Sequence, residues 1–126
     1  MNEQIVLTLP PDPALHDVAH LVIGGLAARL NLTIESLEDL QVALDGLLPE
    51  VEGGPTIAVG LEEGRLELTV GPFDPKSLHG KLDRPAADDE VSLRRVLDTV
   101  SDRFEVVDRD AECWVAVTKS VQRVDA

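Results

Sequence analysis

The sequence predicts an α+β two-layer sandwich, in which a mixed, mainly antiparallel sheet is covered on one face by about three helices. Two observations predict this class. Apolar residues recur at helical spacing in some segments and alternate as in strands in others, and the segments follow the order β, α, α, β, β, loop, α, β, β. No linker or repeat divides the 126 residues, so one domain spanning residues 1–126 is expected.

The chain is expected to open with a strand and a long helix. "QIVLTL" alternates as a strand does, and Pro10 and Pro11 close it. A helix is expected from about Pro13 to Leu30. Gly24 and Gly25 inside it cost about 1 kcal/mol each relative to alanine, so the face that carries them is expected to permit close approach of another element.

A second helix is expected after Thr33, which is a good N-cap residue. Pro49 ends its pattern, because proline disfavours helical geometry in the residue before it. Its apolar face consists of Leu37, Leu40, Ala43, Leu44, Leu47 and Leu48.

The second half of the chain is expected to add a hairpin, a helix and a final strand pair. Two alternating segments, 57–61 and 66–70, flank "EEGR" as a hairpin turn. Residues 71–90 are punctuated by Pro and Gly and are expected to be mostly loop. A third helix is expected over roughly 90–101, followed by "RFEVVD" and "ECWVAVTKSV" as an antiparallel pair.

The composition excludes several partner classes. The formal net charge is -13, from 24 acidic and 11 basic residues, and this field repels nucleic acid and anionic membranes. Cys113 is the only cysteine, so an internal disulfide is excluded. The first residues do not form a signal peptide, and no window approaches a membrane span, so a cytoplasmic protein is expected.

The order of elements, with "LQVALD" on the second helix, "GPFDP" after the hairpin and "LDTVSDRFEV" before the last strand, resembles the bacterial anti-sigma factor and serine-kinase branch of the GHKL (histidine-kinase-like) ATPases. The resemblance covers nearly the whole chain. It implies a domain that binds ATP and Mg²⁺, holds a sigma factor inactive and phosphorylates an anti-anti-sigma (STAS) partner. Many members of that family are homodimers.

The second helix departs from the family at two functional positions. The family keeps a Glu as general base and, four residues later, an Asn that coordinates Mg²⁺; here these positions hold Gly46 and Glu50. Asp45 lies one residue early, which turns its carboxylate by roughly 100° around the helix. Glu50 follows Pro49, so the helix is expected to end before it. Because the family position faces the nucleotide cavity, Gly46→Glu is expected to be tolerated.

The two glycine motifs of the family also lack most of their glycines here. An Asp-x-Gly-x-Gly motif, whose Asp reads adenine, corresponds to Thr69, Gly71 and Phe73, so one glycine remains. The Gly-x-Gly-Leu motif that wraps phosphates corresponds to residues 91–94 and has lost both glycines. Arg94 there has two interpretations, as an attractor for phosphate and as part of a solvated helix face.

The sequence therefore favours a regulatory protein-interaction domain that resembles an anti-sigma factor and is a pseudokinase without a cofactor. A sigma factor, a STAS protein or both are the expected partners, and homodimerisation is a further expectation. The alternative is an active serine-protein kinase whose divergent site still uses ATP and Mg²⁺, through Asp45, Glu50 and Arg94. Absence of catalysis is favoured over activity, because base, adenine reader and phosphate glycines are all replaced.

Two other patterns contain residue types that bind metals. His16 and His20 have the i, i+4 spacing of a zinc-binding pair, but the apolar stripe turns both away from the core, and an accidental surface pair is favoured. The acidic run "DRPAADDE" (83–90) lacks the spacing of a calcium loop and is interpreted as solvated. Trp114 is expected to be at least partly buried in the last strand, because either it or its two neighbours must face the helices.

Overall fold

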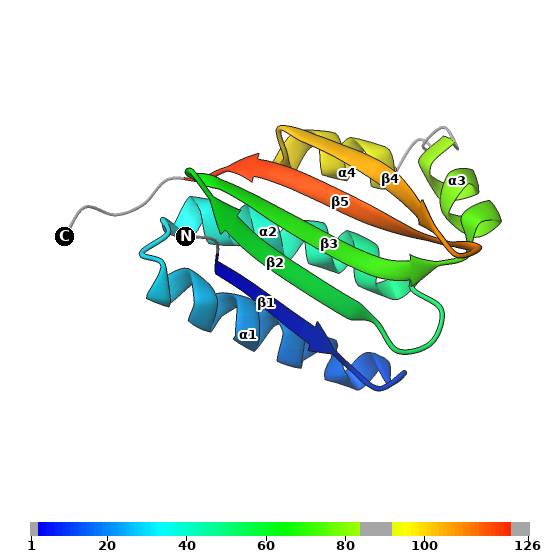
Figure 1. Ribbon diagram of the computed structural model, residues 1–126, viewed down its shortest axis with the longest axis horizontal. Coiled ribbons are helices and arrows are strands. Elements are labelled where there is room, and N and C mark those ends of the chain that lie inside the picture. The colour runs from blue at the N-terminus through cyan, green and yellow to red at the C-terminus, as the bar shows by residue number, and fades with distance from the viewer. Residues whose placement is uncertain (1–2, 84–91, 122–126) are drawn as a thin grey trace.

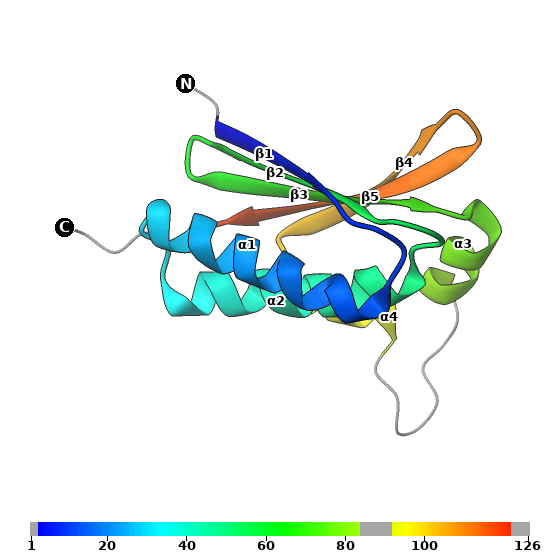
Figure 2. The same cartoon turned by 90° about the horizontal axis from the view of Figure 1, so that it is seen from below.

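The computed structural model of the protein describes residues 3–83 and 92–121, and its helices lie on one side of a twisted sheet (Figures 1 and 2). The α+β class predicted from the sequence is confirmed. The elements in chain order are β1 (Glu3–Thr8), the 3-10 turn η1 (Pro13–Leu15), α1 (His16–Arg29), α2 (Ile34–Leu47), the 3-10 turn η2 (Leu48–Glu50), β2 (Thr56–Glu62), β3 (Arg65–Phe73), α3 (Pro75–Asp83), α4 (Leu93–Val100), β4 (Arg103–Arg109) and β5 (Glu112–Ser120).

The sheet has five strands in the order β1-β2-β3-β5-β4. Every pairing among these strands is antiparallel, so the sheet is antiparallel throughout the described residues and not mixed as the sequence predicted. The last strand, β5, lies between β3 and β4, which leaves β1 and β4 at the edges. The predicted hairpin joins β2 to β3, with Glu63 and Gly64 at positive φ in its turn.

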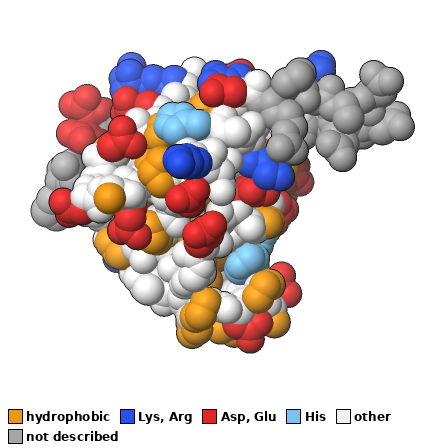
Figure 3. All heavy atoms as spheres, turned by 90° about the vertical axis from the view of Figure 1, so that its right-hand side faces the viewer, with side chains coloured by type: hydrophobic (Ala, Val, Ile, Leu, Met, Phe, Trp, Pro, Cys, Tyr) orange, Lys and Arg blue, Asp and Glu red, His pale blue; other side chains and the backbone are white. Residues whose placement is uncertain are grey.

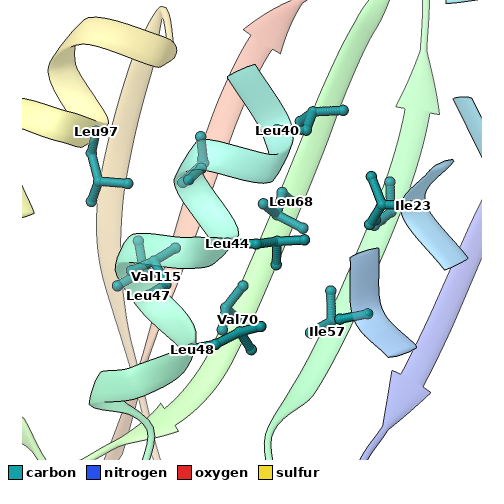
Figure 4. Packing of buried hydrophobic residues seen from close by; sticks show 14 of the residues in the cluster. Ile23, Leu40, Leu44, Leu47, Leu48, Ile57, Leu68, Val70, Leu97 and Val115 are labelled. Atoms are coloured by element: carbon teal, nitrogen blue, oxygen red, sulfur yellow. The ribbon is translucent and has the colours of Figure 1, made fainter. Parts of the chain in front are cut away.

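The core lies between the sheet and the helices. The apolar face of α2 points at the strands, where Leu44 packs beside Leu68 and Val70 (Figure 4). Five of the six predicted core positions on this helix are buried, and Leu37 is half-buried. Thr33 caps α2 as predicted, since its Oγ1 accepts a hydrogen bond from Ser36 N at 3.2 Å.

The segment expected to be mostly loop contains a helix and the end of a strand, so that prediction is wrong. Residues 71–73 extend β3, and α3 follows directly. Asp74 begins this helix, because its Oδ2 accepts a hydrogen bond from Ser77 N at 3.0 Å. Leu78 and Leu82 bury one face of this helix. Their i, i+4 spacing is typical of a helix, but the Pro and Gly residues around them favoured a loop.

The third predicted helix is α4, and Ser92 caps it by accepting a hydrogen bond from Arg95 N. Residues 84–91 lie outside the described residues. The expected start of the helix near residue 90 and most of the acidic run therefore lie there too.

The face of the sheet opposite the helices has no helix over it in the described part of the chain (Figure 2). Trp114 lies on this open face and is half-buried, while Cys113 and Val115 on either side point inward and are fully buried. The prediction for Trp114 is confirmed. Among the described helices, none is long and apolar enough to cross a membrane.

Candidate functional site

The base position of the family lies near the end of α2, where Gly46 faces α4. A Cβ atom built on Gly46 would stand 3.2 Å from Leu93 Cδ1 and 3.7 Å from Val96 Cγ1. The first contact is tighter than ordinary van der Waals packing. Side chains of α4 therefore lie against one side of this position, where the sequence led us to expect an open cavity.

Asp45 points away from Gly46 and toward α1. Its Oδ1 lies 2.7 Å from His20 Nε2, and this contact ties the two helices together. The predicted rotation of the carboxylate around the helix agrees with these two different neighbours. Asp45 therefore does not replace the missing base on the side of Gly46.

Glu50, at the position of the family's metal ligand, lies in η2. The α-helix ends at Leu47, before Glu50, as predicted from Pro49. Glu50 Oε1 lies 3.9 Å from Lys81 Nζ on α3, and both side chains are partly exposed. The ammonium group supplies a positive charge beside this carboxylate from within the chain.

The three residues matched to the adenine motif lie on different sides of the sheet. Thr69 lies on the open face, since Leu68 and Val70 beside it are buried toward the helices. It is therefore separated from Gly46 by the sheet itself. Gly71 lies under Trp114, because a Cβ there would stand 2.6 Å from the ring carbons Cδ2 and Cε3. Phe73 is 2% exposed and belongs to the core.

Arg94 contacts residues of α3 and of β4. Its Nε donates to Leu82 O at 3.1 Å, and one terminal nitrogen lies 3.8 Å from Asp83 Oδ1. The guanidinium carbon also lies 5.5 Å from the centre of the Phe104 ring. These contacts link α4 to the end of α3 and to β4, a structural role that neither of its two predicted interpretations included.

The two histidines of the first helix have different neighbours. His20 contacts Asp45, whereas His16 lines a hollow of about 340 Å³ together with Pro11, Pro13 and Pro49. Among residues 3–83 and 92–121, no three His, Cys, Asp or Glu side chains gather as a metal site. His16 and His20 remain weak metal candidates.

ATP with Mg²⁺, as the family would hold it, does not fit the residues at these positions. The base position has no side chain and is packed under α4, and the carboxylate at the metal position lies beside an ammonium group. Sequence reasoning missed Leu93, Val96 and Lys81 as the residues that fill or pair these positions. A helical reading of "PKSLHGKL" was the available signal for Lys81.

No family model matches the chain. The chain is similar to the serine-protein kinase RsbW of Listeria innocua serovar 6a, with 28% identity over 79 residues, which cover 56% of this chain and 50% of that protein. The serine-protein kinase RsbW of Listeria monocytogenes serovar 1/2a matches with the same identity and coverage. The chain spans about half the length of the curated relatives it matches. This distant similarity agrees with the resemblance drawn from the motifs.

Proposed function

We propose that this chain is a regulatory protein-interaction domain of the anti-sigma type that has lost ATP-dependent kinase activity. The observation that carries the proposal is the packing of Leu93 and Val96 over Gly46. In a phosphoryl-transfer site, positioned charges and a base must act together on the nucleotide. Here apolar side chains of α4 lie against the base position.

The distribution of charge supports a protein partner. At the end of the molecule that carries α3, acidic side chains spread over the surface between a few Lys, Arg and His side chains (Figure 3). The whole chain carries -13, so a basic protein surface is attracted and a phosphate backbone is repelled. A sigma factor, a STAS protein or both are the proposed partners, in a cytoplasmic complex.

The second candidate is an active serine-protein kinase with a divergent site. The similarity to two proteins named as serine-protein kinases favours it. Calorimetry with ATP and Mg²⁺ separates the candidates: the proposal expects no saturable heat, and a Mg²⁺-dependent isotherm in the micromolar range contradicts it.

A binding assay tests the regulatory role itself. Each sigma factor and STAS protein of the source bacterium is purified and titrated into the chain, with and without Mg-ATP. The expected result is a complex with at least one of them whose affinity does not change with Mg-ATP. Phosphate transfer to a STAS protein would establish the kinase instead.

A further inference from the structure

Two adjacent glycines in the middle of α1 have nothing packed on them. Cβ atoms built on Gly24 and Gly25 would meet no atom of the described residues within 4 Å. Neither glycine lies at positive φ, so neither is required by the backbone conformation. Glycine weakens a helix relative to alanine. The described fold therefore accepts a cost in stability here without a packing reason inside the chain.

These glycines lie on the solvent side of α1. With a step of roughly 100° per residue, Leu21 and Ala28 point away from the buried Ala19 and Ile23, and both glycines flank them. Leu21 is 75% exposed, although leucine is normally found inside proteins. An exposed apolar side chain thus stands beside a stretch without side chains.

The neighbouring helix continues this surface. The His20–Asp45 contact holds α2 alongside α1. On the outer side of α2, Ile34 is 73% and Val42 43% exposed. We define the outer helix face by six residues: Leu21, Gly24, Gly25, Ala28, Ile34 and Val42.

Acidic groups surround the outer helix face. Asp17, Glu35, Glu38 and Asp45 on the same two helices are exposed, and Arg29 is the only Lys or Arg within α1 and α2. The open face of the sheet carries both signs, with arginines and glutamates on its strands. Charge complementarity therefore assigns a basic partner to the helices and not to the sheet.

We propose that the outer helix face docks an amphipathic helix of the partner protein, with apolar side chains over Gly24 and Gly25 and Lys or Arg at its margins. Absence of side chains at the two glycines lets a second helix approach closely, and Leu21 and Val42 border the contact. The choice of a sigma factor as the probe rests on the proposed function; the position of the surface does not.

The experiment titrates the sigma factors of the source bacterium, one at a time, into the full chain and its variants. Gly25→Gln, Leu21→Ala and Glu38→Lys alter the outer helix face. Val6→Ala and Glu105→Lys are matched controls on the sheet, where Val6 is 61% exposed. The face variants are expected to weaken binding by about tenfold or more, and the controls by less than about twofold. Gly25→Gln is also expected to raise the thermal midpoint by about 2 °C, because glutamine is the better helix former.

The possible outcomes distinguish failure of the docking surface from failure of the proposed function. A sigma factor that binds the parent and all face variants equally overturns the docking surface and leaves the proposed function standing. Stronger losses in the sheet controls place the contact on the open face and also overturn it. A lower thermal midpoint for Gly25→Gln shows that the glycine serves the fold, which overturns the docking surface regardless of which protein binds. A parent that binds no sigma factor contradicts this choice of partner, and it contradicts the proposed function as well only if no STAS protein binds either. Sedimentation of the parent and of Gly25→Gln shows whether a second copy occupies the face: a dimer that this substitution dissociates would overturn the choice of a basic partner helix.

Discussion

Gly46 on α2 lies against Leu93 on α4, with only 3.2 Å between the position of a Cβ on the glycine and Leu93 Cδ1. This contact joins the vestigial base position to the packing between two helices. A side chain longer than a methyl group at Gly46 would therefore have to displace Leu93.

Replacing Gly46 by Glu is expected to destabilise the protein by about 1–3 kcal/mol, because the longer side chain must displace Leu93 or Val96. This reverses the tolerance expected from the sequence. Gly46→Ala is the control: its close Cβ contact is offset by a gain in helix propensity of about 1 kcal/mol. Urea unfolding of the three proteins measures both effects. A Glu variant as stable as the parent would mean that α4 moves aside readily, and phosphoryl transfer by it would contradict the loss of the site.

Gly71→Ala is expected to cost about 1–3 kcal/mol, because the added methyl group would stand 2.6 Å from ring carbons of Trp114. The ring must move, so the tryptophan emission spectrum should change as well. In a Trp114→Ala background the same Gly71 substitution should cost much less, which a double-mutant cycle measures. Equal costs in both backgrounds would show that the ring does not restrict Gly71.

Burial raises the pKa of the Cys113 thiol above its usual value of 9.0, and the nearby carboxylates of Asp108 and Asp74 raise it further. The unfolded chain therefore loses this proton at lower pH than the folded protein does. The raised thiol pKa therefore stabilises the folded protein below pH 9.0, and this stabilisation is lost as the pH rises through the pKa of the folded state.

Two measurements check the thiol. The free energy of unfolding of the parent should fall more steeply than that of Cys113→Ala between about pH 8 and pH 10. Alkylation of the native protein at neutral pH should be slow and should become fast in denaturant, because Cys113 is fully buried. Rapid alkylation of the folded protein would show that β5 opens easily.

Lys119 on β5 holds α2 to the sheet through Asp39, with Nζ and Oδ2 2.7 Å apart. The lysine side chain is only 17% exposed, so Asp39→Asn leaves a mostly buried ammonium group without its counter-charge. We expect a loss of about 1 kcal/mol, since Asp39 is itself partly exposed and solvent screens the pair. Lys119→Met keeps the stem and should cost less. Denaturation of both single variants and the double variant gives the coupling energy between Lys119 and Asp39. A coupling energy near zero would show that this contact does not stabilise the fold.

The sequence by itself determined most of the local elements, although not α3, and the residues that stand at the motif positions. Thr33, Pro49 and the leucine face of α2 act through neighbours three or four residues away, so the limits and buried face of that helix could be predicted. The hairpin of β2 and β3 could be predicted for the same reason, because its turn and strands are adjacent in the sequence. That Gly46 has no side chain to serve as a base follows from the sequence alone.

Only the tertiary structure decided what surrounds those residues. The antiparallel sheet with β5 between β3 and β4, the contact of Leu93 with Gly46 and the approach of Lys81 to Glu50 join segments far apart in the chain. Periodicity along a sequence records which side of an element is apolar, but it does not record which distant element packs there. Whether a position on one element stays open or is covered depends on that packing, and here Leu93 and Val96 of α4 lie against Gly46.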